Sequence, residues 1–489
     1  MSQRSRDFRQ LSLGLTRRTG RLVTVENANG EAREADYNEL QENLHALSPV
    51  WPHAFDIKAC PHPLIVPQSQ LFRLEKVHQL LSSAITNIIE RWFSDGEARF
   101  PDRMPLETLE EDTLKWMCGL DGGVMPSYHT RQGSWRPDFL LDNRYSHGGF
   151  QICEINSRFP FNGLLHTAFV QQAYLEMEDR TKRLVRPAAK PEDIIDGLFS
   201  LFDPSLPLHL LKGEETGLDI HQLIEYVGSV TGKKPSLITP SDLRLVPCAH
   251  SLTGSSLHCV IGQDSNGSER LEAIHQVGLE LGQDELGELS PTMLREIALR
   301  CFNDLRTVYL VHDKRMLGIV LEELDSLVDR QRLFSSAEAD FLRQHIARTI
   351  NPGSKDMEAI LALSRHSPHI RKDFLLKPIR GGKGQGFIFG SDTTSDEWIS
   401  QLEFLQEAKL EAGQPKYVVQ RRVEQPRFDL LLNGVAAPQH NYLVGTFIAI
   451  QGHYLGLGFW RSSPHRISAL SQGGDWVCSV TAAPAIAKL

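Results

Sequence analysis

The sequence predicts a mixed α/β fold with an inserted α/β layer, and two observations lead to this class. Between residues 207 and 320, short strand-like runs alternate with helical patterns. After residue 336, the chain shows a helical stretch, a strand, a glycine-rich turn, a second strand, a helix and a third strand. Both patterns indicate sheets that pack against helices.

Periodicity predicts the individual elements in chain order. Apolar side chains recur at spacings of three and four between residues 71 and 93, which indicates an amphipathic helix packed on a core. Two β-type runs within residues 138–156 flank a turn-rich segment and predict a hairpin. Further strands are expected at residues 209–211, 236–238, 258–261, 308–311, 374–379, 386–390 and 417–423.

Composition and charge exclude several classes of protein. The chain has 489 residues, of which 41% are hydrophobic and 23% charged, so it is long enough for two to four compact globular units. Its formal net charge of −9 gives no basic footprint for nucleic acid or an anionic membrane. Seven single cysteines without a CxxC pair argue against a disulfide framework and favour a reducing compartment.

The location expected from these features is cytoplasmic or peroxisomal. No apolar stretch approaches the roughly 18–20 residues that span a bilayer, and the first residues lack the apolar core of a signal peptide. The last three residues, Ala487-Lys488-Leu489, resemble a peroxisomal address that an import receptor reads.

A glycine-rich segment follows a strand that carries Lys377. Its residues are Gly381, Gly382, Lys383, Gly384, Gln385 and Gly386. Glycines let backbone N–H groups approach a polyphosphate closely, and a strand lysine can reach phosphates as a point charge. The segment is not a P-loop or a dinucleotide fingerprint, because a strand and not a helix follows it. It is therefore either a flexible flap over a nucleotide or an ordinary glycine hairpin with an exposed lysine.

Two acids and an amide are predicted to share one face of the first hairpin. Glu154 and Asn156 are two residues apart on one strand, and Asp138 lies on the other strand. Such oxygens suit a Mg²⁺ ion that bridges nucleotide phosphates. Arg136 and Arg158 flank this face and offer planar donors for phosphate or carboxylate oxygens. The alternative is that the acids simply pair with these arginines.

One further run suits nucleotide binding. Residues 417–420, Tyr-Val-Val-Gln, are apolar and end in the polar Gln420, which is typical of a hinge strand beside an adenine ring. Most runs of this kind are only core, so this signal is weak alone.

Taken in this order, the metal hairpin, inserted layer, glycine flap and hinge resemble the ATP-grasp ligases of the eukaryotic-type glutathione synthetase group. Glutathionylspermidine synthetase is a related comparison. Two blocks carry the resemblance: residues 136–164, with R-x-D and Q-x-x-E-x-N-S followed by G-L, and residues 373–385, with F-L-L-K-P and the flap glycines. The resemblance covers about residues 70–480 and implies an ATP-grasp fold in the permuted order of that group.

The resemblance also implies roles for single residues. Glu154 and Asn156 would bind Mg²⁺, Arg136 would contact the carboxylate being activated, and Lys377 would contact phosphate. Lys355 corresponds to the group's other ATP lysine. Arg461 corresponds to an arginine that holds a substrate carboxylate, and Gly473 with Gly474 to a loop that closes over it. Ser157 and Arg158 are expected on the substrate side, and the flap residues and Gln420 on the ATP side.

The chain departs from the group at two places. Where the group carries a glutamate as a further metal ligand, this chain has Gly381, and Asp138 is expected to substitute for it. The group's serine-rich run after the metal asparagine is replaced by Arg-Phe-Pro-Phe-Asn at residues 158–162. Glutathione is therefore a doubtful product, and the two phenylalanines suggest a more apolar carboxylate substrate.

The expected activity is ATP-dependent ligation of a small carboxylate to an amine through an acyl phosphate, with ATP and Mg²⁺ as cofactors. Two alternatives stay open: a nucleotide-binding pseudoenzyme or assembly protein, which Gly381 favours, and a phosphotransferase that acts on a hydroxyl group. A homodimer and the peroxisomal import receptor are candidate partners, whereas nucleic acid and membranes are not expected.

Four parts are expected along the chain. They are a peripheral N-terminal arm (residues 1–70), a part with the metal hairpin and helices (71–205), an inserted α/β substrate-binding domain (206–330), and a C-terminal part with the flap and hinge (331–489).

Overall fold

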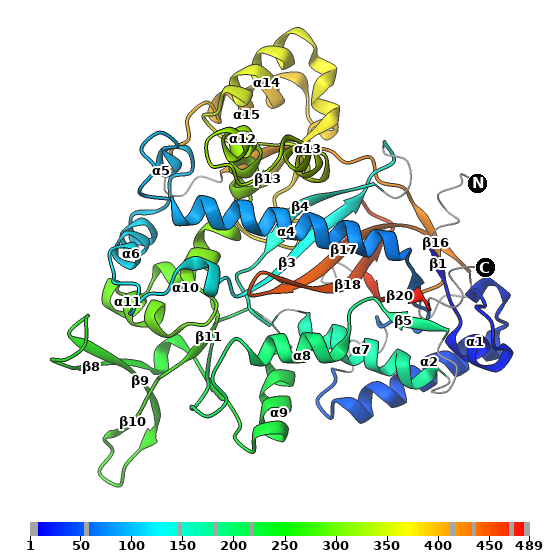
Figure 1. The fold of residues 1–489 in the computed structure, drawn as a ribbon, viewed down its shortest axis with the longest axis horizontal. Helices are drawn as coiled ribbons and strands as arrows, with labels where there is room; N and C mark the ends of the chain where they lie inside the picture. Colours follow the sequence, from blue (N-terminus) through cyan, green and yellow to red (C-terminus); the bar gives the residue numbers. More distant parts are fainter. Residues whose placement is uncertain are drawn as a thin grey trace.

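The computed structural model describes most of the chain (Figure 1). The described residues are 8–52, 58–144, 149–161, 163–178, 184–215, 217, 219–410, 416–432, 437–468 and 474–483. The C-terminal tripeptide that resembles a peroxisomal address lies outside them, as does Gly473. Within the described residues, no helix is both long and apolar enough to cross a membrane.

The centre of the molecule is a six-stranded antiparallel sheet (Figure 1). Along the sheet lie β19 (Asp475–Val477), β18 (His453–Ser463), β17 (Gln439–Ile450), β3 (Ser134–Leu141) and β4 (Phe150–Asn156), and β16 (Phe428–Leu430) pairs with β17. The predicted hairpin is confirmed as β3 and β4. Because β3 also pairs with β17, two segments about 300 residues apart form one continuous surface.

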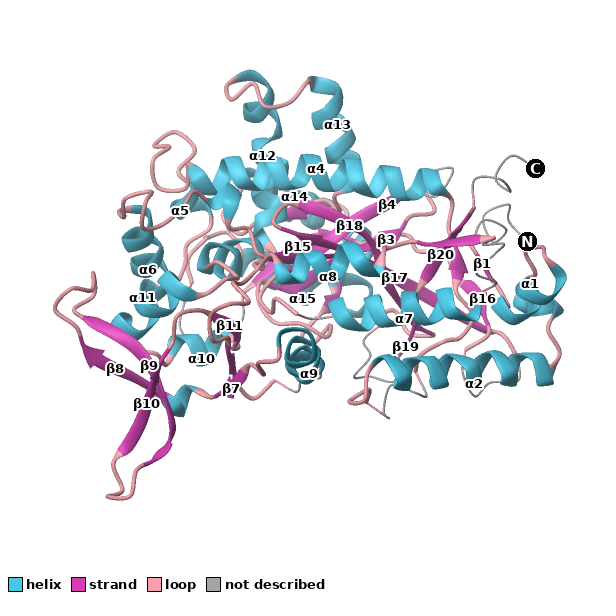
Figure 2. Ribbon diagram, turned by 60° about the horizontal axis from the view of Figure 1, so that its bottom comes forward, coloured by secondary structure: helices cyan, strands magenta, loops and turns pink. Residues whose placement is uncertain are grey.

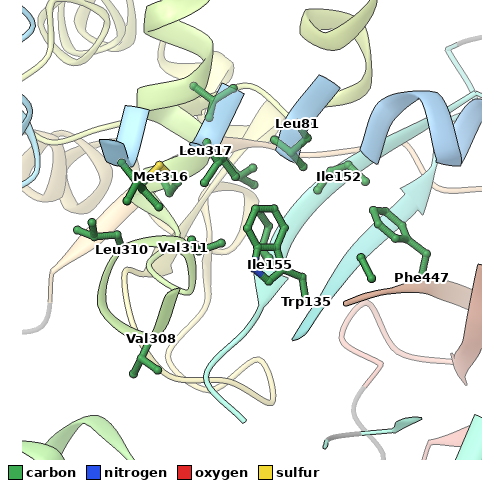
Figure 3. Packing of buried hydrophobic residues seen from close by; sticks show 14 of the residues in the cluster. Leu81, Trp135, Ile152, Ile155, Val308, Leu310, Val311, Met316, Leu317 and Phe447 are labelled. Atoms are coloured by element: carbon green, nitrogen blue, oxygen red, sulfur yellow. The ribbon is translucent and has the colours of Figure 1, made fainter. Parts of the chain in front are cut away.

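Helices cover one face of this sheet and build the main core (Figure 3). The predicted amphipathic helix is confirmed as α4 (Gln68–Glu90), and α12 (Arg315–Asp329) packs beside it. Leu81 of α4 and Leu317 of α12 are at most 1% exposed, and they lie in one cluster with Trp135 of β3. Burying a leucine side chain stabilises the fold by roughly 1.5–3 kcal/mol. This packing fixes the positions of β3 and β4 from the face of the sheet that the helices cover.

A second, smaller antiparallel sheet faces the first. Its order is β12 (Thr349–Ile350), β15 (Tyr417–Arg421), β13 (Phe374–Pro378) and β14 (Ile388–Phe389). It packs with α14 (Lys355–His366) and α15 (Ser395–Phe404) around Trp398 and Leu376, in a hydrophobic cluster separate from the main core. We call this unit the lid sheet.

The inserted layer contains a three-stranded parallel sheet with the order β11 (Val277–Glu280), β6 (His209–Lys212) and β7 (Ser236–Ile238). The helix α9 (Asp219–Thr231) follows β6. An antiparallel meander of β8 (Leu243–Pro247), β9 (Ser255–Gln263) and β10 (Glu269–Ala273) projects from the body of the molecule (Figure 2).

The strand predicted at residues 308–311 is wrong, because residues Thr307–Val311 form a π-helical turn. All four predicted residues are at most 2% exposed. A short run that is apolar on every side has no polar alternation to separate strand from helix.

The remaining elements complete the layers around these sheets. Near the termini, α1 (Leu13–Thr19) and α2 (Gly30–Leu47) pack on α7 (Leu164–Met177), beside a small sheet with the order β1 (Arg9–Gln10), β2 (Leu64–Ile65), β20 (Ser479–Ala482) and β5 (Val185–Pro187). The other α-helices of the described residues are α5 (Phe100–Arg103), α6 (Thr108–Cys118), α8 (Pro191–Phe199), α10 (Gln283–Gly287), α11 (Pro291–Arg300) and α13 (Ser336–His345).

Glu280 at the end of β11 makes stability depend on pH. Burial raises the pKa of Glu280 to about 7, although the nearby Lys212 ammonium opposes this rise. Because this folded-state pKa lies above the ordinary value of 4.5, the folded protein favours the protonated form of Glu280. The contribution of Glu280 to stability is complete below pH 4.5 and is lost as the pH rises through 7. Between these limits, the unfolding free energy of the wild type should fall by up to about 3 kcal/mol relative to Glu280→Gln. Urea unfolding at several pH values measures this, and a difference that does not vary with pH would contradict it.

Candidate active site

A cleft lies between the central sheet and the lid sheet. One wall comes from β3, β4, β17 and β18, and the other from β13, β14 and the end of β15. Its lining residues are Asp138, Leu140, Cys153, Glu154, Leu375, Lys377, Lys383, Gly384, Phe387, Phe389, Gln420, Arg421, Arg422, Val423, Gln425, Val444, Arg461, Arg466, Ile467 and Ser468. The lining mixes charged and apolar side chains, and Lys377 and Arg466 lie over the rings of Phe387 and Phe389.

Sheet register brings the charged residues of the central sheet together. Asp138 lies opposite Glu154, and Arg136 lies opposite Asn156. Arg461 of β18 reaches across β17 and forms an ion pair with Asp138, which is 1% exposed. Arg136 stacks over the ring of Phe459, with its guanidinium carbon 5.6 Å from the ring centre.

The protonation of this cluster follows from burial and its cations. Burial lowers the pKa of Arg136 to about 10, with Arg461 acting in the same direction, so this guanidinium stays charged at neutral pH. Burial raises the pKa of Glu154, but Lys314 and Lys377 outweigh this effect and hold it well below its ordinary value. Glu154 is therefore an ionised carboxylate at the cleft.

Asp138 was predicted to be a metal ligand, and this stays a prediction. Its carboxylate pairs with Arg461, and burial raises its pKa despite that partner. The alternative expectation was that the acids of the hairpin pair with the flanking Arg136 and Arg158. Asp138 does pair with an arginine, but this arginine is Arg461. Asp138 orients Arg461 through Oδ2, whereas its buried Oδ1 has no hydrogen-bond partner among the described residues and is free to face an ion.

Glu154 and Asn156 do fit a Mg²⁺ ion. Glu154 is ionised, and Asn156 lies two residues further along the same strand with an amide oxygen, which is a ligand that Mg²⁺ accepts. No group of three or more His, Cys, Asp or Glu side chains in the described part of the chain is arranged to hold a metal ion. A Mg²⁺ ion bound by one carboxylate and one amide would take its other oxygens from phosphate and water.

Lys377 lies in the cleft as its sequence context predicted. It is 4% exposed and donates to the backbone carbonyl of Cys153 at 3.2 Å. Its Nζ lies 4.0 Å from Oε2 of Glu154 and 5.1 Å from the centre of the Phe387 ring. The buried ammonium is well placed to bind a phosphate oxygen directly, while the ionised carboxylate beside it can hold the Mg²⁺ ion of the same phosphate.

The glycine-rich segment forms a flap between β13 and β14. Gly381, Gly384 and Gly386 have φ values of 86°, 69° and 72°, which side chains adopt with strain. The flap tip reaches the inserted layer, where Lys383 forms an ion pair with Glu215 at 2.7 Å. Gln385 donates its N–H to Gly382, which closes a turn within the flap.

Gly384 supports a specific prediction, because a Cβ there would clash with Cγ2 of Ile467 on the opposite wall. A valine would also be strained at this φ by about 1–3 kcal/mol. Gly384→Val should therefore displace the flap and weaken ATP or ADP binding by about tenfold or more. Titration calorimetry measures the affinity. Gly382→Ala is the comparison, since Gly382 has open space around it and no positive φ, and an equal loss in both variants would contradict the prediction.

The hinge strand beside an adenine ring stays a prediction. Gln420 lines the cleft, but its amide donates to Cys153 O and Thr349 Oγ1, at 3.0 and 2.9 Å. It therefore ties the lid sheet to the central sheet. Arg421, Arg422 and Val423 continue the cleft wall, and sequence reasoning missed them because nothing in their types marks a hinge.

Several predicted residues lie elsewhere. Lys355 begins α14 and lines a separate depression with Glu322 and Arg330. Ser157 is fully buried, and its hydroxyl faces the backbone carbonyl of Thr307 at 3.4 Å. Gly474 is buried just before β19.

The segment from Arg158 to Phe161 also differs from its predicted role. Arg158 contacts Gln283 at 3.3 Å under the inserted layer and is not among the residues that line the cleft. Phe161 is 1% exposed and packs against Phe302 in the core. The expectation of an apolar substrate wall therefore fails for Phe161, whose ring is committed to core packing.

Sequence reasoning missed a charged group at the start of α12. Lys314 lies 3.9 Å from Glu154 and donates to the flap carbonyl of Gly381 at 2.8 Å. Its neighbours Asp313 and Arg315 form a buried ion pair. Three consecutive charged residues directly before an apolar helix were the available signal, since such residues are rarely buried without a reason.

Comparisons with known proteins identify the family. The family described as AnkG N-terminal domain matches residues 77–310. The ATP-grasp enzyme ankG of Aspergillus thermomutatus is 38% identical over 430 residues, which cover 85% of this chain and 87% of that protein. Among solved structures, the glutathione synthetase-like effector GSS30 of Globodera pallida, in its apo form, aligns with a TM-score of 0.49 and 10% identity over 91% of this chain and 97% of that one. The resemblance to ATP-grasp enzymes seen in the sequence is confirmed, and the chain belongs to the family of ATP-grasp enzymes that includes ankG.

Proposed function

We propose that this protein is an ATP-dependent ligase that joins a small carboxylate to an amine, with release of ADP and phosphate. The observation that carries the proposal is the composition of the cleft. A flap of glycines and the buried Lys377 lie on one side, and the ionised Glu154 lies with Arg461 on the other. Arg136 lies two residues before Asp138 on β3, opposite Asn156, and is not among the residues that line the cleft. The first pair suits a nucleotide polyphosphate, and the arginines suit a substrate carboxylate.

The reaction divides among these residues by position. Arg136 and Arg461 would hold the substrate carboxylate, and the Asp138 carboxylate keeps Arg461 in a fixed orientation. Lys377 and the flap N–H groups would hold the phosphates in line with that carboxylate. A Mg²⁺ ion on Glu154 and Asn156 would supply charge neutralisation at the phosphates.

Transfer of the terminal phosphate would give an acyl phosphate, which an amine then attacks while phosphate leaves. The protein's contribution is positioning and electrostatic stabilisation in a site that excludes water. The ion pair between Lys383 and Glu215 joins the flap tip to the inserted layer.

The test is a screen for ADP release over pairs of carboxylates and amines, including amino acids, dipeptides and polyamines, with mass spectrometry of the product. An amide product supports the ligase, and a phosphoester would identify a phosphotransferase. The arginine pair favours the ligase, because a hydroxyl acceptor has no charge for it to bind.

A second candidate is a nucleotide-binding protein without catalysis, which Gly381 favours because no acid stands at that position. ATP binding without ADP release in any combination would support this candidate. Absence of nucleotide binding would contradict both.

A further inference from the structure

The antiparallel meander of β8, β9 and β10 has an open edge along β10. Figures 1 and 2 both show this meander projecting from the body of the molecule. Among the described strands only β9 pairs with β10, so the other side of β10 has no hydrogen-bonded neighbour there. Such an edge can pair with a further strand, and proteins usually protect it with proline, with a bulge or by covering it.

The two outer strands of the meander differ in this protection. β8 follows Pro240 and ends at Pro247, and proline has no N–H to offer to a neighbouring strand. β10 has no proline, and its first three residues are exposed, with Leu271 at 39%. The bulge of the β9–β10 hairpin lies at Ile261 of β9, so the backbone of β10 itself is regular. β10 is therefore the edge that is available for pairing.

The direction of the backbone groups along β10 follows from the hydrogen bond just after the strand. Ile274 donates its N–H to the carbonyl of Leu257 on β9 at 2.9 Å. Backbone groups of successive strand residues point to alternate sides, so those of Glu269, Leu271 and Ala273 point away from β9. In an antiparallel pair centred on Leu271, these three residues would face the same three residues of a second copy in reverse order. Each copy would then donate three N–H groups to the other.

The charges of β10 match the same register. Arg270 is exposed and forms no ion pair or hydrogen bond with the described residues. The side chain of Glu272 is 36% exposed and lies 3.7 Å from the buried His209. In the pair centred on Leu271, Arg270 of each copy would lie directly opposite Glu272 of the other, where side chains share one face and interact. The strand is thus complementary in charge to itself.

We propose that β10 pairs antiparallel with β10 of a second copy of this chain, across a two-fold axis at Leu271. The two three-stranded meanders would then form one continuous sheet, with two cross-strand ion pairs on one face and the two Leu271 side chains together on the other. A five-residue strand pair is small for a protein interface, so we expect a dissociation constant between about 1 and 100 µM.

Sedimentation velocity of the full chain over a range of concentrations tests the proposal. The wild type should form dimers, and Arg270→Glu should weaken them by about tenfold or more, because each ion pair becomes a pair of carboxylates. Glu272→Arg should weaken them similarly, because each ion pair becomes a pair of guanidinium groups. Lys372→Glu is the matched control, since it makes the same change of charge at an exposed residue just before β13 and should dimerise like the wild type.

A mixture of the two single variants gives the most specific readout. One chain then has two acids at positions 270 and 272 and the other has two arginines, so every cross-strand pair is again of opposite charge. The mixture should dimerise at concentrations at which each variant alone is monomeric. The double variant Arg270→Glu with Glu272→Arg should dimerise with itself but not with the wild type.

Each outcome decides the proposal. A wild type that stays monomeric at about 100 µM overturns it, and the edge of β10 would then be open to a peptide of another protein. Wild-type dimers that Arg270→Glu does not weaken also overturn it, because the contact must then lie elsewhere. A mixture of the single variants that stays monomeric rules out this register. If either single variant does not fold, the double variant, alone and mixed with the wild type, takes their place.

Discussion

Glu154→Gln should lower ATP turnover with a productive substrate pair by about 10²–10³-fold, because it removes the only ionised carboxylate proposed to bind Mg²⁺. The substitution keeps the shape of the side chain, and it also leaves Lys314 and Lys377 without their shared negative partner. The measurement is steady-state ADP release as a function of Mg²⁺ concentration. Where no substrate pair has been found, the Mg²⁺-dependent gain in ATP affinity is the alternative readout, and it should disappear.

The control for this prediction is Glu358→Gln, which removes one carboxylate from the exposed side of α14. It should leave both readouts unchanged. Glu154→Gln that turns over ATP at the wild-type rate under limiting Mg²⁺ would show that this carboxylate does not hold the ion.

Arg461→Met should lower the free energy of unfolding by about 3–5 kcal/mol, because it leaves the carboxylate of Asp138 buried without its ion-pair partner. Asp138 is 1% exposed, so water cannot replace the guanidinium. Chemical denaturation measures the loss. It should shrink when the pH falls far enough to protonate Asp138, since burial already raises the pKa of this carboxyl.

A double-mutant cycle tests whether this effect belongs to the pair. Asp138→Asn combined with Arg461→Met should be less destabilised than the sum of the single variants, because no unpaired charge remains. Strict additivity would mean that the two groups do not interact in the folded protein.

The sequence predicted the local parts of this molecule well, because local patterns carry them. The helix α4, the β3–β4 hairpin and the placement of Lys377 before a glycine flap all follow from spacings within about 25 residues. The strand expected at residues 308–311 failed because complete burial removes the polar alternation that identifies a strand.

The site was predicted less completely, for a related reason. Arg461 contacts Asp138 across 323 residues of chain, and Lys314 approaches Glu154 across 160, so no local spacing could reveal either contact. Lys355 illustrates the opposite case, since it stands at a plausible place in the sequence but its helix directs it to another depression. Only the tertiary arrangement decides which of the lysines meet the cleft.

The central sheet takes its middle strand, β17, from the last tenth of the chain. During synthesis, the β3–β4 hairpin therefore leaves the ribosome long before β17 and Arg461, and one of its edges stays open meanwhile. Asp138 has no arginine partner on β18 until nearly the whole polypeptide has been made. A chain truncated before residue 439 would expose this edge and a carboxylate that the native core is built to bury, so premature termination should give aggregation-prone fragments and not a partly active enzyme.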